Sequence, residues 1–290
     1  AGCVLKEEGI SKVFIGKDTR ISGYMFESAL QAGFISSGMD VTLLGPLPTP
    51  GVSFLANSNN QVGLVISASH NLFEDNGIKF FNKDGQKFSA ELEKRIESKL
   101  NHDMVAVDSI NLGKAARMND AQGRYIEFCK STFLGLDLTG LSILLDCANG
   151  ATYSVAPKVF EELGAEVHAI GSSPDGININ QNCGSTSPEF LKEEIAKGEY
   201  DLGIAFDGDG DRILIVSSNG DILDGDDILY ILSQNLTEGS GVIGTLMTNK
   251  ALEIHFEENN IDFYRSDVGD KYVLQKLVEK NWLLGGEPSG

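Results

Sequence analysis

The stretch Leu202-Gly203-Ile204-Ala205-Phe206-Asp207-Gly208-Asp209-Gly210-Asp211-Arg212 joins an apolar strand to an acidic loop. Three carboxylates stand on alternate residues of that loop, and the glycines between them let the backbone turn tightly. Such a loop can direct several oxygen donors at one point, which is the ligand set that hard divalent cations prefer. Because three bare carboxylates would repel one another, the stretch predicts a metal site at the end of a strand.

Three other interpretations of this loop compete with a metal site. An Asp/Gly cluster after a strand is often a solvated turn. An EF-hand also begins with alternating aspartates, but it needs Gly at its sixth position and Glu at its twelfth, where this chain has Arg212 and Ser218. The third is a phosphatase in which Asp207 is phosphorylated and Asp209 is the acid. It is disfavoured because that motif calls for Thr or Val where Asp211 stands.

A second apolar strand, residues 64–66, runs into the small polar sequence Ser67-Ala68-Ser69-His70-Asn71. The ends of strands are where α/β proteins place their chemistry. The hydroxyl of Ser69 could carry a phosphoryl group, with donors beside it on the next two residues; a capped turn without function is the alternative. Downstream, a tight turn leads into a strand that carries Lys79, which alone would be read as a solvated edge residue.

The order of the motifs resembles the α-D-phosphohexomutase superfamily and, within it, the bacterial phosphoglucosamine mutase family. The motifs are Ser67-Ala68-Ser69-His70-Asn71, Asn76-Gly77-Ile78-Lys79, Asp207-Gly208-Asp209-Gly210-Asp211-Arg212 and Gly286-Glu287-Pro288-Ser289-Gly290. The finer match rests on residues 146–151, 174–180, 183–186 and 268–273. The resemblance covers nearly the whole chain.

This resemblance implies a phosphoserine mechanism in one shared cleft. Ser69 would be the phosphoserine, and one Mg²⁺ per active site would be held by Asp207, Asp209, Asp211 and the Ser69 phosphate. The further catalytic residues implied are His70, Lys79, Arg20 and Arg212. Which of the first three is the general acid or base stays open, although an arginine, which keeps its proton in proteins, would be an unusual base. Glu287 and Ser289 would bind the ring hydroxyls of the sugar.

The reaction implied is the interconversion of glucosamine 6-phosphate and glucosamine 1-phosphate through a hexosamine 1,6-bisphosphate, by an isomerase that feeds UDP-N-acetylglucosamine and peptidoglycan precursor synthesis. Phosphoglucomutase/phosphomannomutase activity is the main alternative, because Asp267 and Ser187 stand where some relatives carry Lys and His. A non-catalytic sugar-phosphate-binding homologue is a second. Such a homologue would be expected to lose Ser69 or one of the aspartates, and all are present.

The composition fits a cytoplasmic enzyme. The chain has 290 residues with a net charge of −19, which argues against nucleic-acid binding, since phosphate backbones call for clustered cations. It contains no apolar stretch of about 18 residues, so we expect no membrane partner. Its four cysteines lack metal-ligand spacing, and Cys147, which follows an apolar strand, is expected to be a reduced core thiol. A homodimer is left open.

Strands and helices alternate along the chain, which predicts tandem α/β/α sandwich domains with mixed, mostly parallel sheets. We expect strands at 12–15, 41–44, 62–66, 142–146, 166–170, 202–206, 213–216, 241–246, 262–265 and 282–286. We expect helices at 24–36, 90–100, 122–133, 155–163, 190–196, 225–236, 251–258 and 271–280. Prolines 46, 48 and 50 are read as breaks, and residues 102–119, which show little periodicity, as the crossover to a second domain.

Three domains are predicted: 1–118 with the phosphoserine loop, 119–222 with the metal loop, and 223–290 with the sugar loop. The resemblance implies four domains around the cleft. We therefore expect the chain to lack the extreme N-terminus and the fourth domain, and its third domain to be incomplete.

Overall fold

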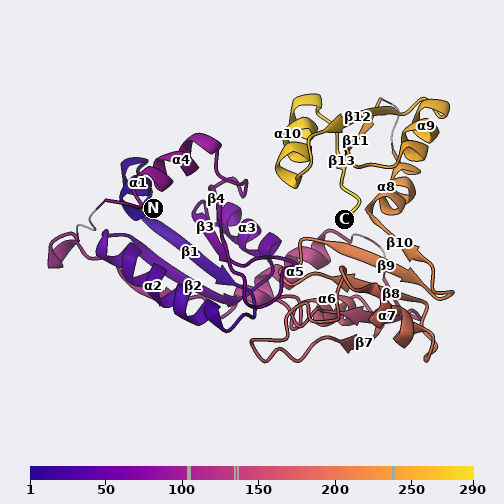
Figure 1. Cartoon of the computed structure of the whole chain (residues 1–290), viewed down its shortest axis with the longest axis horizontal. Helices are drawn as coiled ribbons and strands as arrows, with labels where there is room; N and C mark the ends of the chain where they lie inside the picture. The colour runs from indigo at the N-terminus through magenta and orange to yellow at the C-terminus, as the bar shows by residue number, and fades with distance from the viewer. Residues whose placement is uncertain (103–105, 134, 136, 237–238) are drawn as a thin grey trace.

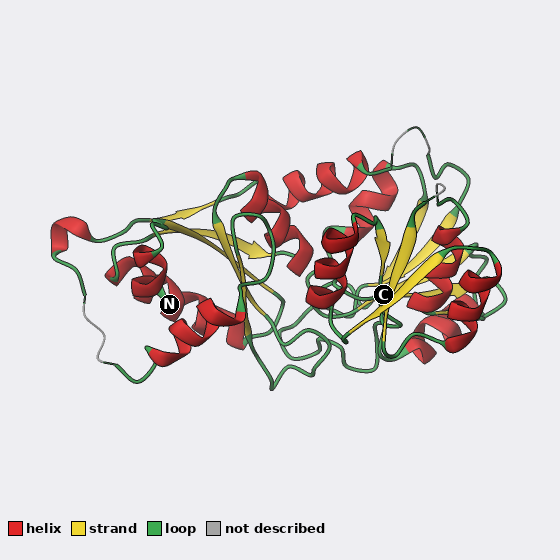
Figure 2. Ribbon diagram, turned by 90° about the horizontal axis from the view of Figure 1, so that it is seen from above, coloured by secondary structure: helices red, strands yellow, loops and turns green. Residues whose placement is uncertain are grey.

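The structure is a computed structural model that describes residues 1–102, 106–133, 135, 137–236 and 239–290. Its strands form three separate sheets, which follow one another along the chain (Figure 1). We call the parts built on these sheets the first, second and third units. Seen from above, helices lie on both sides of the strands (Figure 2). The predicted class, tandem α/β/α sandwiches with mixed, mostly parallel sheets, is confirmed.

The first unit is a five-stranded sheet in the order β4-β3-β1-β2-β5, in which only β4 is antiparallel to its neighbour. Successive residues of β1 point to opposite faces, so that Val13 and Ile15 enter one hydrophobic core while Phe14 enters the other. Its elements are α1 (Gly2–Glu7), β1 (Lys12–Lys17), α2 (Ser22–Ser36), β2 (Asp40–Pro46), α3 (Thr49–Ser58), β3 (Val62–Ile66), β4 (Ile78–Phe81), α4 (Ala90–Ser98), η1 (Ser109–Asn111) and β5 (Ala115–Arg117).

The second unit has the strand order β10-β9-β8-β6-β7, with β9 antiparallel to both of its neighbours. The antiparallel return after the acidic loop, predicted at residues 213–216, is therefore confirmed. The elements are α5 (Ala121–Ser131), β6 (Ser142–Asp146), α6 (Ala156–Glu162), β7 (Glu166–Ile170), α7 (Pro188–Ile195), β8 (Leu202–Phe206), β9 (Ile213–Ser217) and β10 (Ile222–Leu223).

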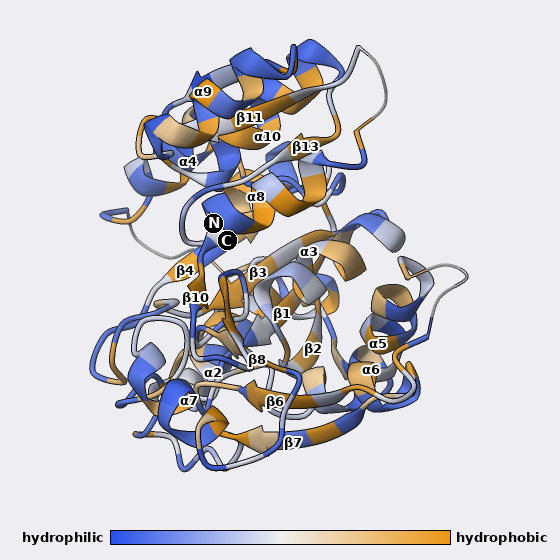
Figure 3. Cartoon of the chain, turned by 90° about the vertical axis from the view of Figure 1, so that its right-hand side faces the viewer, coloured by the Kyte–Doolittle hydropathy of each residue, from blue (hydrophilic) through white to orange (hydrophobic). Residues whose placement is uncertain are grey.

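The third unit is a parallel three-stranded sheet in the order β12-β11-β13. Its central strand β11 is fully buried. Figure 3 shows that strand β6 of the second unit is largely hydrophobic. The elements are α8 (Gly225–Ser233), β11 (Gly241–Thr245), α9 (Lys250–Glu258), β12 (Asp262–Ser266), α10 (Asp270–Lys280) and β13 (Leu284–Gly285). No helix among the described residues is long and apolar enough to cross a bilayer.

Two segments differ from the sequence-based expectation. Helix α3 occupies part of the stretch in which prolines were read as breaks. Pro48 is its N-cap and Pro50 lies in its first turn, where a missing N–H does no harm because those N–H groups have no partner inside the helix. The segment 102–119, expected to be a crossover, contains β5, which completes the first sheet. Residues 103–105 of that segment lie outside the described residues.

Helix α5 joins the first two units. It packs against α3 of the first unit and α6 of the second, and its Ala121 and Ile126 belong to the same hydrophobic core as Phe14 and Val65. A shared core of this kind opposes independent motion of the two units, because separating them would expose apolar surface. The loops at the ends of β3 and β8 are therefore held in a fixed relation.

Candidate active site

Two loops from different units meet at one point, and each connects a pair of antiparallel strands. The serine loop (residues 67–77) joins β3 to β4, and the aspartate loop (residues 207–212) joins β8 to β9. The Ser69 hydroxyl donates a hydrogen bond of 2.6 Å to Oδ2 of Asp207 and lies 3.5 Å from Oδ1 of Asp211. The structure thus brings together the hydroxyl and the carboxylates that the sequence singled out.

The aspartate loop wraps around the side chain of its own first residue. Oδ1 of Asp207 accepts hydrogen bonds from the backbone N–H groups of Gly210, Asp211 and Arg212, at 3.1, 3.2 and 3.2 Å. Gly210 takes φ +70°, a backbone conformation that glycine adopts without strain. Three backbone N–H groups of the loop thus hold the Asp207 side chain and fix the shape of the loop.

The carboxylates of this loop are crowded and lie in a largely buried site. Asp207 and Asp209 are fully buried. Burial and the charges of the two neighbouring aspartates raise the pKa of Asp207. Burial alone would raise the pKa of Asp209, but the ammonium of Lys79 outweighs it and lowers that pKa. A raised carboxylate pKa means that the ionised cluster needs a compensating positive charge.

Lys79 supplies part of that charge. Its Nζ lies 2.7 Å from Oδ2 of Asp209 and 3.1 Å from Oδ2 of Asp211. Burial acts to lower the pKa of this lysine, but the two carboxylates raise it, so the side chain is an ammonium at neutral pH. A lysine on a strand is weak evidence for a functional residue when only the sequence is considered, but the structure places Lys79 against two of the three carboxylates.

The donor set fits a divalent cation. Asp207, Asp209 and Asp211 each offer a carboxylate oxygen, and these three oxygens lie within 4.8 Å of one another. Oδ1 of Asp209 is buried and has no hydrogen-bond partner among the described residues. An unpartnered buried carboxylate oxygen is unfavourable unless a ligand satisfies it, and an all-oxygen donor set suits Mg²⁺.

Thr49 is a site residue that the sequence reasoning missed. Its hydroxyl donates to Oδ2 of Asp209, and its backbone N–H donates to the carbonyl of the same residue at 2.8 Å. Thr49 is the first residue of α3, a helix that was not predicted because its prolines were interpreted as breaks. Pro at the first positions of a helix would have been the signal that could reveal it.

Arg20 is close to Ser69 but does not reach its hydroxyl. The side chain is 0% exposed, its guanidinium forms an ion pair with the buried Asp18, and its Nη2 donates to the backbone carbonyls of Ser69 and Asn71. Asn180, which ends the matched stretch 174–180 but was given no role from the sequence, donates to the same two carbonyls. The structure places Arg20 behind the serine loop, in contact with its backbone.

His70 and Arg212 lie at the open side of the two loops. His70 is exposed, and partial burial together with the nearby charge of Arg212 lowers its pKa. Arg212 also lies close enough to Asp211 to influence its pKa. The Arg212 side chain is half-buried and, within the described part of the chain, no hydrogen bond or ion pair holds its guanidinium. It is therefore available for an anionic ligand.

The predicted sugar loop, residues 286–290, is tied to the aspartate loop through backbone contacts. The Ser289 carbonyl accepts a hydrogen bond of 3.2 Å from the N–H of Ile213, the residue after Arg212. Oε1 of Glu287 accepts from the N–H of Gly269, at 2.8 Å, just before α10. Glu287 and Ser289 therefore lie near the site, but neither forms a hydrogen bond with Ser69 or with the aspartates of the loop.

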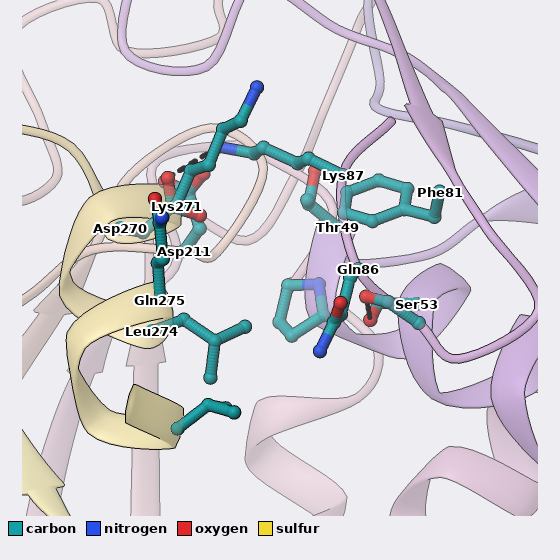
Figure 4. A pocket seen from close by; sticks show the side chains of 13 residues that line it. Thr49, Ser53, Phe81, Gln86, Lys87, Asp211, Asp270, Lys271, Leu274 and Gln275 are labelled. Atoms are coloured by element: carbon teal, nitrogen blue, oxygen red, sulfur yellow. Dashed lines mark hydrogen bonds and ion pairs between the residues drawn. The ribbon is translucent and has the colours of Figure 1, made fainter. Parts of the chain in front are cut away.

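A pocket of about 440 Å³ opens beside the aspartate loop, between the first and third units. In Figure 4 the side chains of α10 face those of α3 and of the turn after β4 across it, with Asp211 at its edge. Lys87 and Asp270 form an ion pair of 2.5 Å over this space, and Nζ of Lys271 donates to the Phe88 carbonyl at 3.3 Å. The units that carry Ser69 and the sugar loop therefore touch across the pocket.

The fold and the two loops define a class of tandem α/β proteins that place a serine hydroxyl against a loop of alternating aspartates. Family models of phosphoglucomutase/phosphomannomutase match three segments: α/β/α domain I at residues 1–105, domain II at 124–220 and domain III at 224–290. The chain belongs to this phosphoglucomutase/phosphomannomutase family. The matches leave residues 106–123 and 221–223 unassigned, so the predicted boundaries at 118 and 222 stay predictions.

The curated relatives that match the whole chain narrow the resemblance to phosphoglucosamine mutases. One from Marinomonas sp. (strain MWYL1) is 55% identical over 296 residues, and the match covers 66% of its length. Another, from Aeromonas salmonicida (strain A449), is 54% identical, with 67% of its length covered. The chain thus spans about two thirds of the length of these relatives.

Solved structures show the same fold. A phosphoglucomutase/phosphomannomutase family protein from Burkholderia thailandensis matches 100% of this chain with a TM-score of 0.83 and 25% identity, over 65% of its own length. The N-acetylphosphoglucosamine mutase of Aspergillus fumigatus, solved in complex with GlcNAc-6P and magnesium, matches 83% of this chain and 63% of its own, with a TM-score of 0.60. At 18% identity, the second match supports the fold alone.

Proposed function

We propose that the protein is a phosphoglucosamine mutase: a Mg²⁺-dependent phosphotransferase that interconverts glucosamine 6-phosphate and glucosamine 1-phosphate through a phosphorylated Ser69. One observation carries the proposal. The hydroxyl of Ser69 lies 2.6 Å from a carboxylate of the aspartate cluster, across the junction of two units. The similarity of the whole chain to about two thirds of the length of curated phosphoglucosamine mutases supports the choice of substrate.

The proposed reaction consists of two balanced transfers. In the first, phosphorylated Ser69 gives its phosphoryl group to the 1-hydroxyl of glucosamine 6-phosphate. The bond from phosphorus to Oγ breaks and a bond to the sugar oxygen forms, while the sugar hydroxyl proton passes to a base and Oγ takes up a proton. The hexosamine 1,6-bisphosphate then reorients and returns its 6-phosphoryl group to Oγ, which loses its proton, while a proton goes to the 6-oxygen. Glucosamine 1-phosphate leaves, and the enzyme is phosphorylated again.

Phosphoryl transfer depends mainly on positioning and on neutralising the charge of the phosphoryl oxygens. Asp207, Asp209 and Asp211 would hold the Mg²⁺, which supplies positive charge beside the Ser69 phosphate when bound. Arg212 is free to pair with phosphoryl oxygens, and a guanidinium offers two parallel donors for this task. We assign the proton-transfer roles to His70 and Lys79, and the binding of ring hydroxyls to Glu287 and Ser289.

The proposal is tested by intact-mass measurement and phosphopeptide mapping of the full-length protein, before and after incubation with a hexosamine 1,6-bisphosphate and Mg²⁺. We expect a gain of one phosphate, located on Ser69. Fragmentation must separate Ser69 from Ser67, since both lie in the same short motif. Phosphate on Asp207 would indicate a phosphatase instead, and no phosphate on a well-folded protein would indicate a binding role.

Substrate preference is tested separately. We expect a higher kcat/KM for glucosamine phosphates than for glucose or mannose phosphates. A preference for the latter two would keep the phosphoserine mechanism but move the protein to phosphoglucomutase/phosphomannomutase activity. The cytoplasmic location stays a prediction, and the homodimer stays open.

Thr49→Val should weaken cation binding by roughly tenfold or more. The valine has nearly the same shape but loses the hydroxyl that donates to Oδ2 of Asp209, and groups that orient metal ligands typically contribute 10- to 100-fold to metal affinity. Titration with Mn²⁺, followed by calorimetry, measures the change. Thr132→Val is the matched control, because that hydroxyl bonds only to a carbonyl of its own helix, α5. Equal affinities of Thr49→Val and the wild type would contradict the prediction.

Lys79→Met should have the opposite effect on cation binding in the unphosphorylated protein. The ammonium lies within 3.1 Å of two of the carboxylates and opposes a second cation there. Removing it is expected to tighten Mn²⁺ binding by about tenfold or more, although turnover falls. Lys83→Met, on the exposed turn after β4, is the control for loss of a positive charge. Unchanged or weaker binding by Lys79→Met would show that the lysine does not compete with the cation.

A further inference from the structure

Two buried side chains from two different units hold the backbone of the serine loop. Asn180 lies between β7 and α7 of the second unit and is 5% exposed. Its Nδ2 donates hydrogen bonds of 2.9 Å to the carbonyl of Ser69 and 2.9 Å to that of Asn71. From the first unit, Nη2 of Arg20 donates to the same two carbonyls.

The two donors are themselves held in place. The Arg20 guanidinium forms an ion pair with Asp18, whose side chain is fully buried. The backbone N–H of Asn180 donates to the carbonyl of Ala148 at 2.9 Å, which fixes its loop on the second unit. Each carbonyl of the serine loop therefore receives one donor from each unit, and neither donor contacts the Ser69 hydroxyl.

The backbone that these donors hold is in an unfavourable conformation. Ser69 has φ +53°, in the left-handed region that residues with a side chain adopt only at an energetic cost. Its N–H donates to the hydroxyl of the buried Ser67 at 2.9 Å, so both sides of the residue are fixed. Such a conformation persists only where the surrounding contacts over-determine it.

The same anchor sets the distance to the aspartate loop. A Cβ added to Gly208 would lie 2.6 Å from the Ser69 carbonyl oxygen and 2.6 Å from Nδ2 of Asn180. The absence of a side chain at Gly208 thus lets the aspartate loop pack directly on the anchored backbone. On the other side of this contact, the Ser69 hydroxyl meets Asp207.

We infer that Asn180 is a positioning residue for phosphoryl transfer, acting with Arg20 to fix the backbone conformation that directs the Ser69 hydroxyl to the aspartate loop. The inference rests on the proposed function. It also gives Arg20 a role other than proton transfer, because its enclosed guanidinium contacts loop carbonyls. The positioning depends on the docking of two units, since either unit alone supplies one donor to each carbonyl.

The test compares Asn180→Ala, Asn180→Asp and the wild type in the full-length protein. The first variant removes the amide, and the second keeps its shape but presents carboxylate oxygens to the two carbonyls. Gln181→Ala is the matched control, since it is exposed on the same loop. For each protein we would measure the melting temperature, Mn²⁺ affinity, phosphate on Ser69, kcat, KM and the ³¹P resonance of the phosphoserine.

We expect kcat to fall by on the order of 10- to 100-fold in both Asn180 variants, with KM changed less than about threefold, because misplacement of a reacting group acts mainly on the chemical step. The ³¹P resonance should shift, whereas Gln181→Ala should behave as the wild type. A wild-type kcat in either Asn180 variant, or a fall in kcat with an unshifted ³¹P resonance, would overturn the inference. Absence of phosphate from Ser69 in the wild type would instead overturn the proposed function.

Discussion

Ser69→Ala is expected to abolish turnover, lowering kcat by at least about 10⁴-fold, while the protein keeps its fold. Alanine has no oxygen to carry the phosphoryl group, and loss of the group that bonds covalently to the substrate is among the most severe single changes an enzyme can undergo. The fold should tolerate it because the anchoring contacts of the serine loop involve backbone carbonyls and N–H groups, which alanine retains.

The measurement combines a coupled turnover assay with phosphopeptide mapping after incubation with the bisphosphate. Ser98→Ala, at the exposed end of α4, is the control for loss of a serine hydroxyl and should turn over normally. An unchanged melting temperature of Ser69→Ala would show that its fold is intact. Normal turnover by the folded variant would reject the phosphoserine mechanism, and phosphate on Asp207 in that variant would revive the phosphatase interpretation.

Much of the fold could be predicted from local sequence patterns. Buried strands such as 62–66 and 202–206 are short apolar runs that end in polar loops, and both were located at the residues that the structure shows. Helix α3 was not predicted, because its prolines were interpreted as helix breakers and not as residues of the first turn. The three-residue strand β5 is exposed along its whole length and has no apolar pattern, so only its pairing with β2 defines it.

The candidate site was predictable where its chemistry lies in one short motif. Ser69 and the three aspartates stand in loops whose composition is itself informative. Asn180 and Thr49 act through contacts with residues more than 100 positions away in the sequence. No local pattern records such a contact, and a single Asn or Thr is chemically unremarkable until the fold supplies its partner.

Arg20 is a second case in which the sequence does not show the contact that a side chain makes. The motif resemblance assigned Arg20 to the cleft, and the structure places it beside the serine loop, but a resemblance does not say which atoms of the loop the guanidinium contacts. The burial of Arg20 determines which atoms it contacts. The side chain is 0% exposed and paired with Asp18, and it meets the loop at backbone carbonyls. A role in positioning follows from that geometry more directly than a role in proton transfer.

Asp209→Asn is expected to weaken Mn²⁺ binding by at least about 100-fold and to lower turnover with it. Asp209 is fully buried, its Oδ1 has no hydrogen-bond partner among the described residues, and its Oδ2 already accepts from Thr49 and Lys79. Oδ1 is therefore the oxygen of this residue that is available to a cation. Asparagine keeps the shape of the side chain but removes its negative charge. It also replaces one carboxylate oxygen with an NH₂ group, which cannot coordinate a cation.

The matched control is Asp221→Asn, which removes one carboxylate charge from the exposed turn between β9 and β10. Calorimetric Mn²⁺ titration reads binding directly, so the result does not depend on an activity assay. Chelation of the wild type tests a different point, namely whether transfer needs a cation at all, and added Mg²⁺ should restore turnover. If chelation stopped transfer but Asp209→Asn bound Mn²⁺ as tightly as the wild type, the cation would be required but held elsewhere. Only a loss in both experiments places the required cation on the aspartate loop.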